Sequence, residues 1–187
     1  YYNKPNQEGL YQHFKAVAGR SPLPVILYNV PSRTGVNISP ETVLRLAQDF
    51  DNVVAVKEAA GDFQQAQTLI NICPKNFSVL SGDDEMSLSM ILAGAKGVIS
   101  VIGNAIPNHY SNIIQKGLRK EVDAAYDIQY RILNLIRLIY EEGNPTGIKV
   151  LMEDIGICKN NLRLPLVKAS PFLTSKLKEV LEQVMRQ

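Results

Sequence analysis

The chain has 187 residues, 45% of them hydrophobic, which is enough for one ordinary globular core but too few for two large domains. Its 20 Lys and Arg residues nearly balance 18 Asp and Glu residues. The net charge of +2 is too small, and the basic residues too scattered, to indicate a nucleic acid or an anionic membrane as a partner. No apolar run approaches the roughly 20 residues that a membrane-spanning helix needs.

The two cysteines, Cys73 and Cys158, stand alone in apolar surroundings, outside any CxxC or CxxH spacing. The two histidines each fall in a helical pattern, so a metal site is not indicated. Unpaired, widely spaced cysteines are typical of a reducing cytosol. We therefore expect a cytoplasmic protein that holds no metal.

The chain opens with residues 1–5 (YYNKP), which read as the end of a strand that enters a turn. This start suggests that residues are missing upstream. Leu10, Phe14 and Val17 then repeat at helical spacing and predict an amphipathic helix.

Four short apolar runs, rich in β-branched residues, follow along the chain. Each is continuous rather than alternating, which is typical of parallel strands buried on both faces. Amphipathic helical stretches separate the runs, and Ser39 and Pro40 supply an N-cap and a first helical residue for one that continues to about Asp49. The predicted strands are Pro24–Tyr28, Val53–Lys57, Phe77–Leu80 and Gly97–Val101.

After the fourth run the chain reads as helical, apart from an irregular connection over Asn160–Pro171. The expected helices run from Pro107 to about Gly117, from Val122 to Tyr140, from Thr146 to Ile155 and from Thr174 to Arg186.

Alternation of helices with parallel strands predicts βαβ units of the α/β class. Four strands could form a small open sheet or half of an eight-stranded barrel, and a complete barrel needs about 250 residues. An isolated half would leave two bare edges, which natural proteins avoid. We expect residues 1–103 to be the C-terminal half of a (β/α)8 TIM barrel, and residues 104–187 to be the last barrel helix with a helical extension.

Lys57 ends an otherwise apolar strand, and ligands of parallel α/β folds bind at the carboxyl ends of their strands. An ordinary lysine has a pKa near 10.4, so a neutral amine at pH 7 costs roughly 4.6 kcal/mol. Desolvation lowers the pKa of a buried lysine by several units, and a neutral amine can attack a ketone to form an imine. The alternative is a lysine that extends to solvent or pairs with Glu58.

Other polar residues follow the same strand ends. Tyr28 is a packing residue or a proton shuttle, and Arg33 is a solvated loop arginine or a bidentate ligand for a carboxylate. Gly82 either serves a turn or lets the backbone approach a ligand closely. Asp83 and Asp84 fit a helix cap better than acid catalysis.

Taken in order, these segments resemble the dihydrodipicolinate synthases of the pyruvate-dependent class I aldolase superfamily, which are (β/α)8 barrels. The resemblance spans almost the whole chain. The matching segments are YYN(K)P, ILYNVPSRTG, VKEA, LSGDD and GVISV, with Gly143–Lys149 (GNPTGIK) and Leu162–Pro165 (LRLP) further on.

The resemblance implies that pyruvate condenses with L-aspartate-4-semialdehyde on the way to lysine and diaminopimelate. It implies that Lys57 forms the imine with pyruvate, that Tyr28 relays protons, and that Arg33 holds the carboxylate of the semialdehyde. No metal and no organic cofactor is implied, because the lysine imine itself is the electron sink.

The resemblance also implies a homotetramer built from tight dimers, in which Tyr2 of one subunit completes the relay of its neighbour. Gly82 and Ile99 match positions that line the pyruvate pocket through backbone groups, and Tyr1 matches one near a lysine-inhibitor site. The family's relay uses a threonine from an early strand that this chain does not contain, so we expect the fragment alone to be inactive.

Two alternatives remain. A sister pyruvate aldolase, of the N-acetylneuraminate lyase or ketodeoxygluconate type, has the same lysine and tyrosine but generally lacks an arginine at the position of Arg33. The chain could also be a non-catalytic half that associates with a complementary N-terminal half.

Overall fold

The computed structural model describes residues 2–186, so the expectations for Tyr1 lie outside the described residues. The chain divides into two compact units between Ile99 and Ser100, whereas the sequence placed the division after residue 103. Residues 2–6 form no strand, so the expected strand end is wrong for Tyr2. Within the part of the chain that the structure describes, no helix is both long and apolar enough to cross a membrane.

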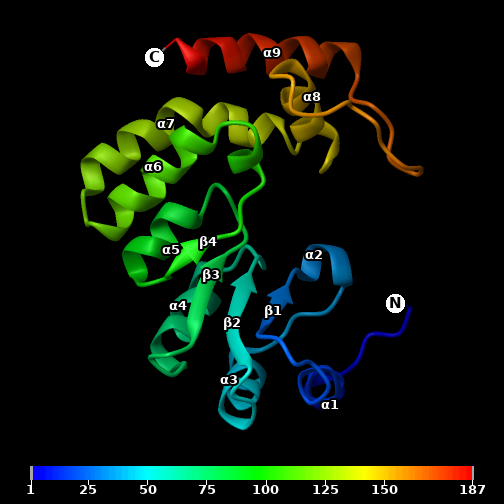
Figure 1. The fold of residues 1–187 in the computed structure, drawn as a ribbon, viewed down its shortest axis with the longest axis vertical. Helices are drawn as coiled ribbons and strands as arrows, with labels where there is room; N and C mark the ends of the chain where they lie inside the picture. The colour runs from blue at the N-terminus through cyan, green and yellow to red at the C-terminus, as the bar shows by residue number, and fades with distance from the viewer. Residues whose placement is uncertain (1, 187) are drawn as a thin grey trace. The chain divides into compact units, whose positions relative to one another are not determined.

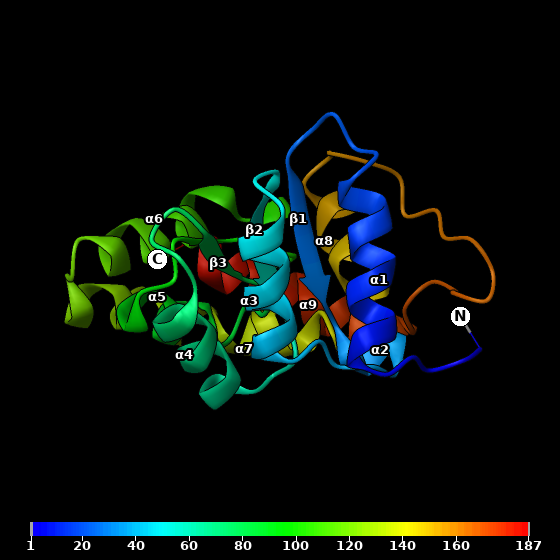
Figure 2. The same cartoon turned by 90° about the horizontal axis from the view of Figure 1, so that it is seen from below.

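The first unit alternates helices with four parallel strands in the order β1-β2-β3-β4 (Figure 1), which confirms the predicted α/β pattern. Its helices α1, α3 and α4 form a row in which each contacts the next, with α3 on β2 and α4 on β3 (Figure 2). The strands are β1 (Val25–Asn29), β2 (Val53–Glu58), β3 (Ser78–Ser81) and β4 (Gly97–Val98). The helices are α1 (Gln7–Ala18), α2 (Pro31–Thr34), α3 (Pro40–Asp49), α4 (Phe63–Ile72) and α5 (Ser87–Ala93).

Strand β1 differs from the expected strand that is buried on both faces. Leu27 and Asn29 are buried, but Ile26 is 46% exposed and Tyr28 is 45% exposed. The described residues therefore cover only one face of β1, the one that carries Leu27 and Asn29. Strand β4 is also shorter than predicted, although the Ile99 N–H still donates to the Ser81 carbonyl at 2.9 Å.

Helix α1 presents a different face to the core from the one predicted. Tyr11 and Ala18 are its buried residues, whereas Leu10 and Phe14 are half-buried and Val17 is exposed. The residues of the predicted apolar stripe are therefore less buried than Tyr11 and Ala18. Helical spacing identifies an amphipathic helix but does not say which neighbour covers its apolar face.

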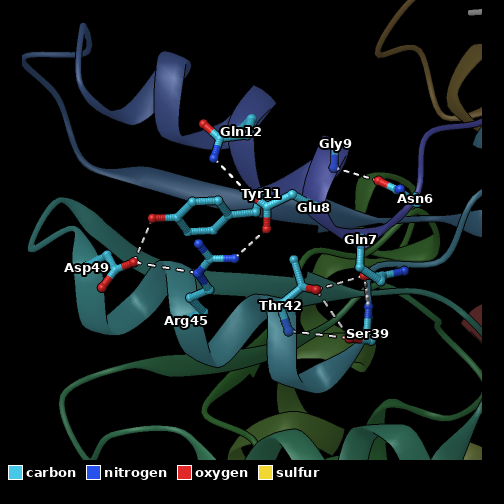
Figure 3. Close-up of polar contacts among 10 residues, drawn as sticks. All are labelled: Asn6, Gln7, Glu8, Gly9, Tyr11, Gln12, Ser39, Thr42, Arg45 and Asp49. Carbon is cyan, nitrogen blue, oxygen red and sulfur yellow. Dashed lines mark hydrogen bonds and ion pairs between the residues drawn. The ribbon is translucent and has the colours of Figure 1, made fainter.

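A polar cluster joins α1 to α3 (Figure 3). The Tyr11 hydroxyl donates to Asp49 Oδ2 at 2.7 Å, and the Arg45 guanidinium carbon lies 3.4 Å from the centroid of the Tyr11 ring. Arg45 also forms an ion pair with Glu8 at 2.6 Å. These contacts fix α1 along the outer side of α3.

The second unit is helical, as predicted, and its core includes Ile132, Leu135 and Ile136 of α7, which are buried. Its elements are η1 (Ile102–Asn104), α6 (Pro107–Leu118), α7 (Val122–Leu138), α8 (Thr146–Asp154) and α9 (Pro171–Met185).

Two helices begin with the same Ser-Pro pair, and only one was recognised. Ser39 caps α3, which confirms that prediction. The predicted start of the last helix at Thr174 is wrong, because α9 begins at Pro171 and the Ser170 hydroxyl accepts from the Leu173 N–H at 3.1 Å. Proline at the first helical position favours a helix start, so Pro171 belongs to the helix rather than to the connection before it.

Candidate active site

Lys57 and Tyr28 lie side by side at the carboxyl ends of two neighbouring strands. They are register partners in the β1–β2 ladder, so their side chains project from the same face of the sheet. Lys57 Nζ lies 4.1 Å from the centroid of the Tyr28 ring, a cation–π distance, and Lys57 is half-buried. The structure thus brings together the two residues for which the sequence predicted imine formation and proton transfer.

Gly82 lies directly after β3, and because it has no side chain it leaves room for the Lys57 side chain. A Cβ at this position would lie 2.9 Å from Lys57 Cε, 3.1 Å from Lys57 Cγ and 2.7 Å from the Ala59 Cβ. Gly82 is not among the glycines with positive φ. A glycine is therefore needed at position 82 because the Lys57 side chain approaches so closely. The backbone conformation of this turn does not itself require a glycine.

The remaining predicted residues lie in segments outside the strands. Arg33 is exposed on α2, a single helical turn rather than an irregular loop, and Gly35 ends that turn with φ of 71°. Ile99 follows β4 with its side chain exposed, and Tyr2 is 94% exposed. None of these placements tests the binding roles expected of these residues.

Tyr28 also faces a hollow beside the edge strand. This hollow has a volume of about 650 Å³, and its lining includes Tyr2, Leu10, Phe14, Tyr28 and Thr34. Lys57 does not contribute to this lining, so the hollow lies next to the tyrosine and not over the amine.

Glu58 is a functional candidate that the sequence suggested only as an ion-pair partner of Lys57. Successive residues of a strand point to opposite faces, and Glu58 accordingly turns away from Lys57 into a site where it is 2% exposed. Its carboxylate bonds with Asn29 and Gln65 instead. The proposed pairing of Lys57 with Glu58 is therefore wrong.

The hydrogen bonds to Glu58 come from three separate segments. Asn29 Nδ2 donates to Oε2 at 2.9 Å and to Oε1 at 3.2 Å, the Ala60 N–H donates to Oε1 at 2.7 Å, and Gln65 Nε2 donates to Oε2 at 3.0 Å. Burial raises the pKa of Glu58 above its usual value, and these hydrogen bonds oppose that shift.

The raised pKa of Glu58 predicts how stability changes with pH. A carboxyl whose pKa is higher in the folded state contributes its stability fully below the unfolded pKa, near 4.5, and loses it as the pH rises through the folded pKa. We expect the free energy of unfolding of the wild type, relative to Glu58→Gln, to fall as the pH is raised from about 4.5. Chemical denaturation of both proteins at a series of pH values checks this, and a constant difference would contradict it.

Asp83 does not cap α5 as predicted, because Met86 is the N-cap residue of that helix and no side chain caps it. Asp83 Oδ1 instead accepts from the N–H groups of Glu85 and Met86, both at 2.9 Å, in the turn that precedes α5. Asp84 is buried. Across residues 2–186, no group of three or more His, Cys, Asp or Glu residues is placed to hold a metal ion.

Comparison with known proteins gives one consistent result. The model of the Dihydrodipicolinate synthetase family matches residues 1–184. The 4-hydroxy-tetrahydrodipicolinate synthase of Flavobacterium psychrophilum is 55% identical over 177 residues, which are 95% of this chain and 60% of that protein. The chain thus spans about 60% of the length of the curated relatives it matches.

Solved structures agree with this result. Dihydrodipicolinate synthase from Aquifex aeolicus matches 98% of this chain with a TM-score of 0.95 and 42% identity, over 62% of that chain. The chloride-inhibited enzyme from Acinetobacter baumannii, complexed with pyruvate, matches 99% of this chain with a TM-score of 0.94 and 39% identity, over 63% of that chain. The four parallel strands are therefore part of an incomplete barrel.

Proposed function

Because this chain belongs to the dihydrodipicolinate synthetase family, we propose that the full-length protein condenses pyruvate with L-aspartate-4-semialdehyde to give 4-hydroxy-tetrahydrodipicolinate. The observation that carries this proposal is the contact of Lys57 Nζ with the Tyr28 ring, opposite Gly82. Support for pyruvate comes from the Acinetobacter baumannii relative, which was solved with it.

In the proposed reaction, the Lys57 amine adds to the keto carbon of pyruvate and water leaves, giving an imine. Loss of a methyl proton turns the imine into an enamine, whose carbon attacks the aldehyde of the second substrate. We assign proton transfer at the carbinolamine and at the new alkoxide to the Tyr28 phenol, and the 4.1 Å distance from Lys57 Nζ to the centroid of the Tyr28 ring supports this assignment. Ring closure by the substrate's own amine then releases Lys57.

The other residues have supporting roles in this proposal. Arg33 is exposed at the mouth of the site and would bind the semialdehyde carboxylate through its planar guanidinium. The backbones of Gly82 and Ile99 would line the pyruvate pocket, and Tyr2 would complete the proton relay of a neighbouring subunit. The assembly we propose is a homotetramer of tight dimers.

We propose that the 187-residue chain by itself is inactive, since the early-strand threonine of the family lies outside it and it spans about 60% of its relatives. A second candidate is therefore a structural half that associates with a complementary N-terminal half. The exposed faces of Ile26 and Tyr28 on the edge strand favour such an association. We place the full-length protein in the cytoplasm, because Cys73 and Cys158 are unpaired.

Incubating the full-length protein with each substrate set tests the condensation. We expect turnover of pyruvate with aspartate semialdehyde and none of N-acetylneuraminate. Arg33→Ala should raise the semialdehyde KM by roughly 10-fold to 100-fold, the worth of a charge-assisted hydrogen bond, while pyruvate imine formation stays at the wild-type rate. Cleavage of N-acetylneuraminate would favour a sister aldolase, whereas an unchanged semialdehyde KM in Arg33→Ala would contradict the role proposed for Arg33.

A further inference from the structure

The pair Asn29–Glu58 occupies the rung of the β1–β2 ladder that directly follows the pair Tyr28–Lys57. Tyr28 and Lys57 project from one face of the sheet, whereas Asn29 and Glu58 project from the opposite face and are buried. The two strands are thus joined by side-chain hydrogen bonds immediately behind the reacting pair. Backbone bonds continue past it, with the Ala59 N–H donating to the Asn29 carbonyl at 2.9 Å.

We propose that Glu58 and Asn29 are positioning residues, which hold the ends of β1 and β2 so that Lys57 stays against Tyr28. This role rests on the proposed function. Glu58 is too deeply buried to touch a substrate, and its carboxylate points away from the amine, so it acts through Lys57 and not on the reacting atoms.

The network around this pair reaches beyond the two strands. Asn29 Oδ1 accepts from the Ile38 N–H at 3.0 Å, and Asn29 Nδ2 donates to Asn37 Oδ1 at 2.8 Å. Gln65 in α4 bonds to both Asn37 and Glu58. The network around this buried carboxylate therefore joins two strands, the segment before α3 and the start of α4.

The polarity of this network makes the carboxylate hard to replace. Every group that Glu58 bonds, namely Asn29 Nδ2, the Ala60 N–H and Gln65 Nε2, is a donor. A hydrocarbon at this position leaves the Ala60 N–H without this acceptor, and leaves Asn29 Nδ2 and Gln65 Nε2 to share Asn37 Oδ1, so the strand ends must shift for the donors to find other acceptors. Glutamine keeps the size and one acceptor oxygen, so it should preserve part of the geometry.

The test measures imine formation by trapping with borohydride in the full-length protein at saturating pyruvate. A fraction of misfolded molecules lowers the final yield of adduct, whereas a misplaced lysine lowers the rate constant and leaves the yield unchanged. We expect Glu58→Leu to lower the rate constant on the order of 100-fold, the effect of a shift of about 1 Å, and Glu58→Gln to lower it less. The pyruvate KM should change much less than the rate constant.

Tyr11→Phe is the matched control, because it removes the hydrogen bond to Asp49 between α1 and α3 in the same unit. It should lower the melting temperature and leave the trapping rate constant unchanged. If folded Glu58→Leu traps pyruvate at the wild-type rate, the positioning role is wrong even though imine formation stands. If Glu58→Leu does not fold, a wild-type rate in Glu58→Gln overturns the role and a reduced rate supports it. Absence of any adduct in the wild type overturns the proposed function itself.

Discussion

Replacing Lys57 with methionine is expected to abolish the pyruvate adduct that borohydride traps in the full-length protein. Methionine keeps a flexible unbranched side chain of similar length in the space beside Gly82 and Tyr28, so the site retains its packing but loses its nucleophile. Condensation should fall by several orders of magnitude, because no other step proceeds without the imine. Mass spectrometry of the peptide that contains residue 57 measures the adduct directly.

Lys96→Met is the control for this experiment. Lys96 is exposed and directly precedes β4, at the amino end of that strand, whereas Lys57 lies at the carboxyl end of β2. Its variant should form the adduct at the wild-type rate and yield. An adduct of normal yield in Lys57→Met, on any other lysine, would show that this amine is not the nucleophile.

Much of the fold could be predicted because the sequence patterns that indicate strands and helix starts each lie within a few consecutive residues. Continuous apolar runs indicated the four strands, and Ser39 with Pro40 indicated the start of α3. The errors concern properties that depend on neighbours in space. The burial of β1 and the buried face of α1 are set by which elements pack against them, and the spacing of Leu10, Phe14 and Val17 carries no such information.

The residues of the candidate site show the same difference between local signals and signals that depend on neighbours in space. Lys57 and Tyr28 could be placed together, because the carboxyl ends of neighbouring parallel strands meet at one edge of a sheet. The buried network of Glu58 could not be predicted, since Asn29 and Gln65 lie far from each other in the sequence and meet only in the fold. The alternation of side chains along β2 was the available signal, because it sends residue 58 to the face opposite residue 57.

A second large effect is expected from a single methyl group at Gly82. Alanine there would place its Cβ 2.9 Å from Lys57 Cε and 2.7 Å from the Ala59 Cβ, distances that real Cβ atoms essentially never show. The Gly82 N–H donates to the Glu58 carbonyl at 2.8 Å, which limits how far the backbone can shift away from Ala59, so the lysine side chain must move as well. We expect Gly82→Ala to lower the rate constant of imine trapping on the order of 100-fold. Overpacking should destabilise the protein by about 1 to 3 kcal/mol.

Two further variants distinguish two causes of the defect expected in Gly82→Ala, namely displacement of the lysine and general backbone strain. Gly61→Ala meets no atom within 4 Å but has φ of 74°, so it should cost about 1 to 2 kcal/mol of stability and leave the trapping rate constant unchanged. Adding Ala59→Gly to Gly82→Ala removes the nearest methyl contact and leaves the contact with Lys57. If the position of the lysine controls the rate, this double variant recovers stability but stays slow. Full recovery of the rate would instead assign the defect to the contact with Ala59.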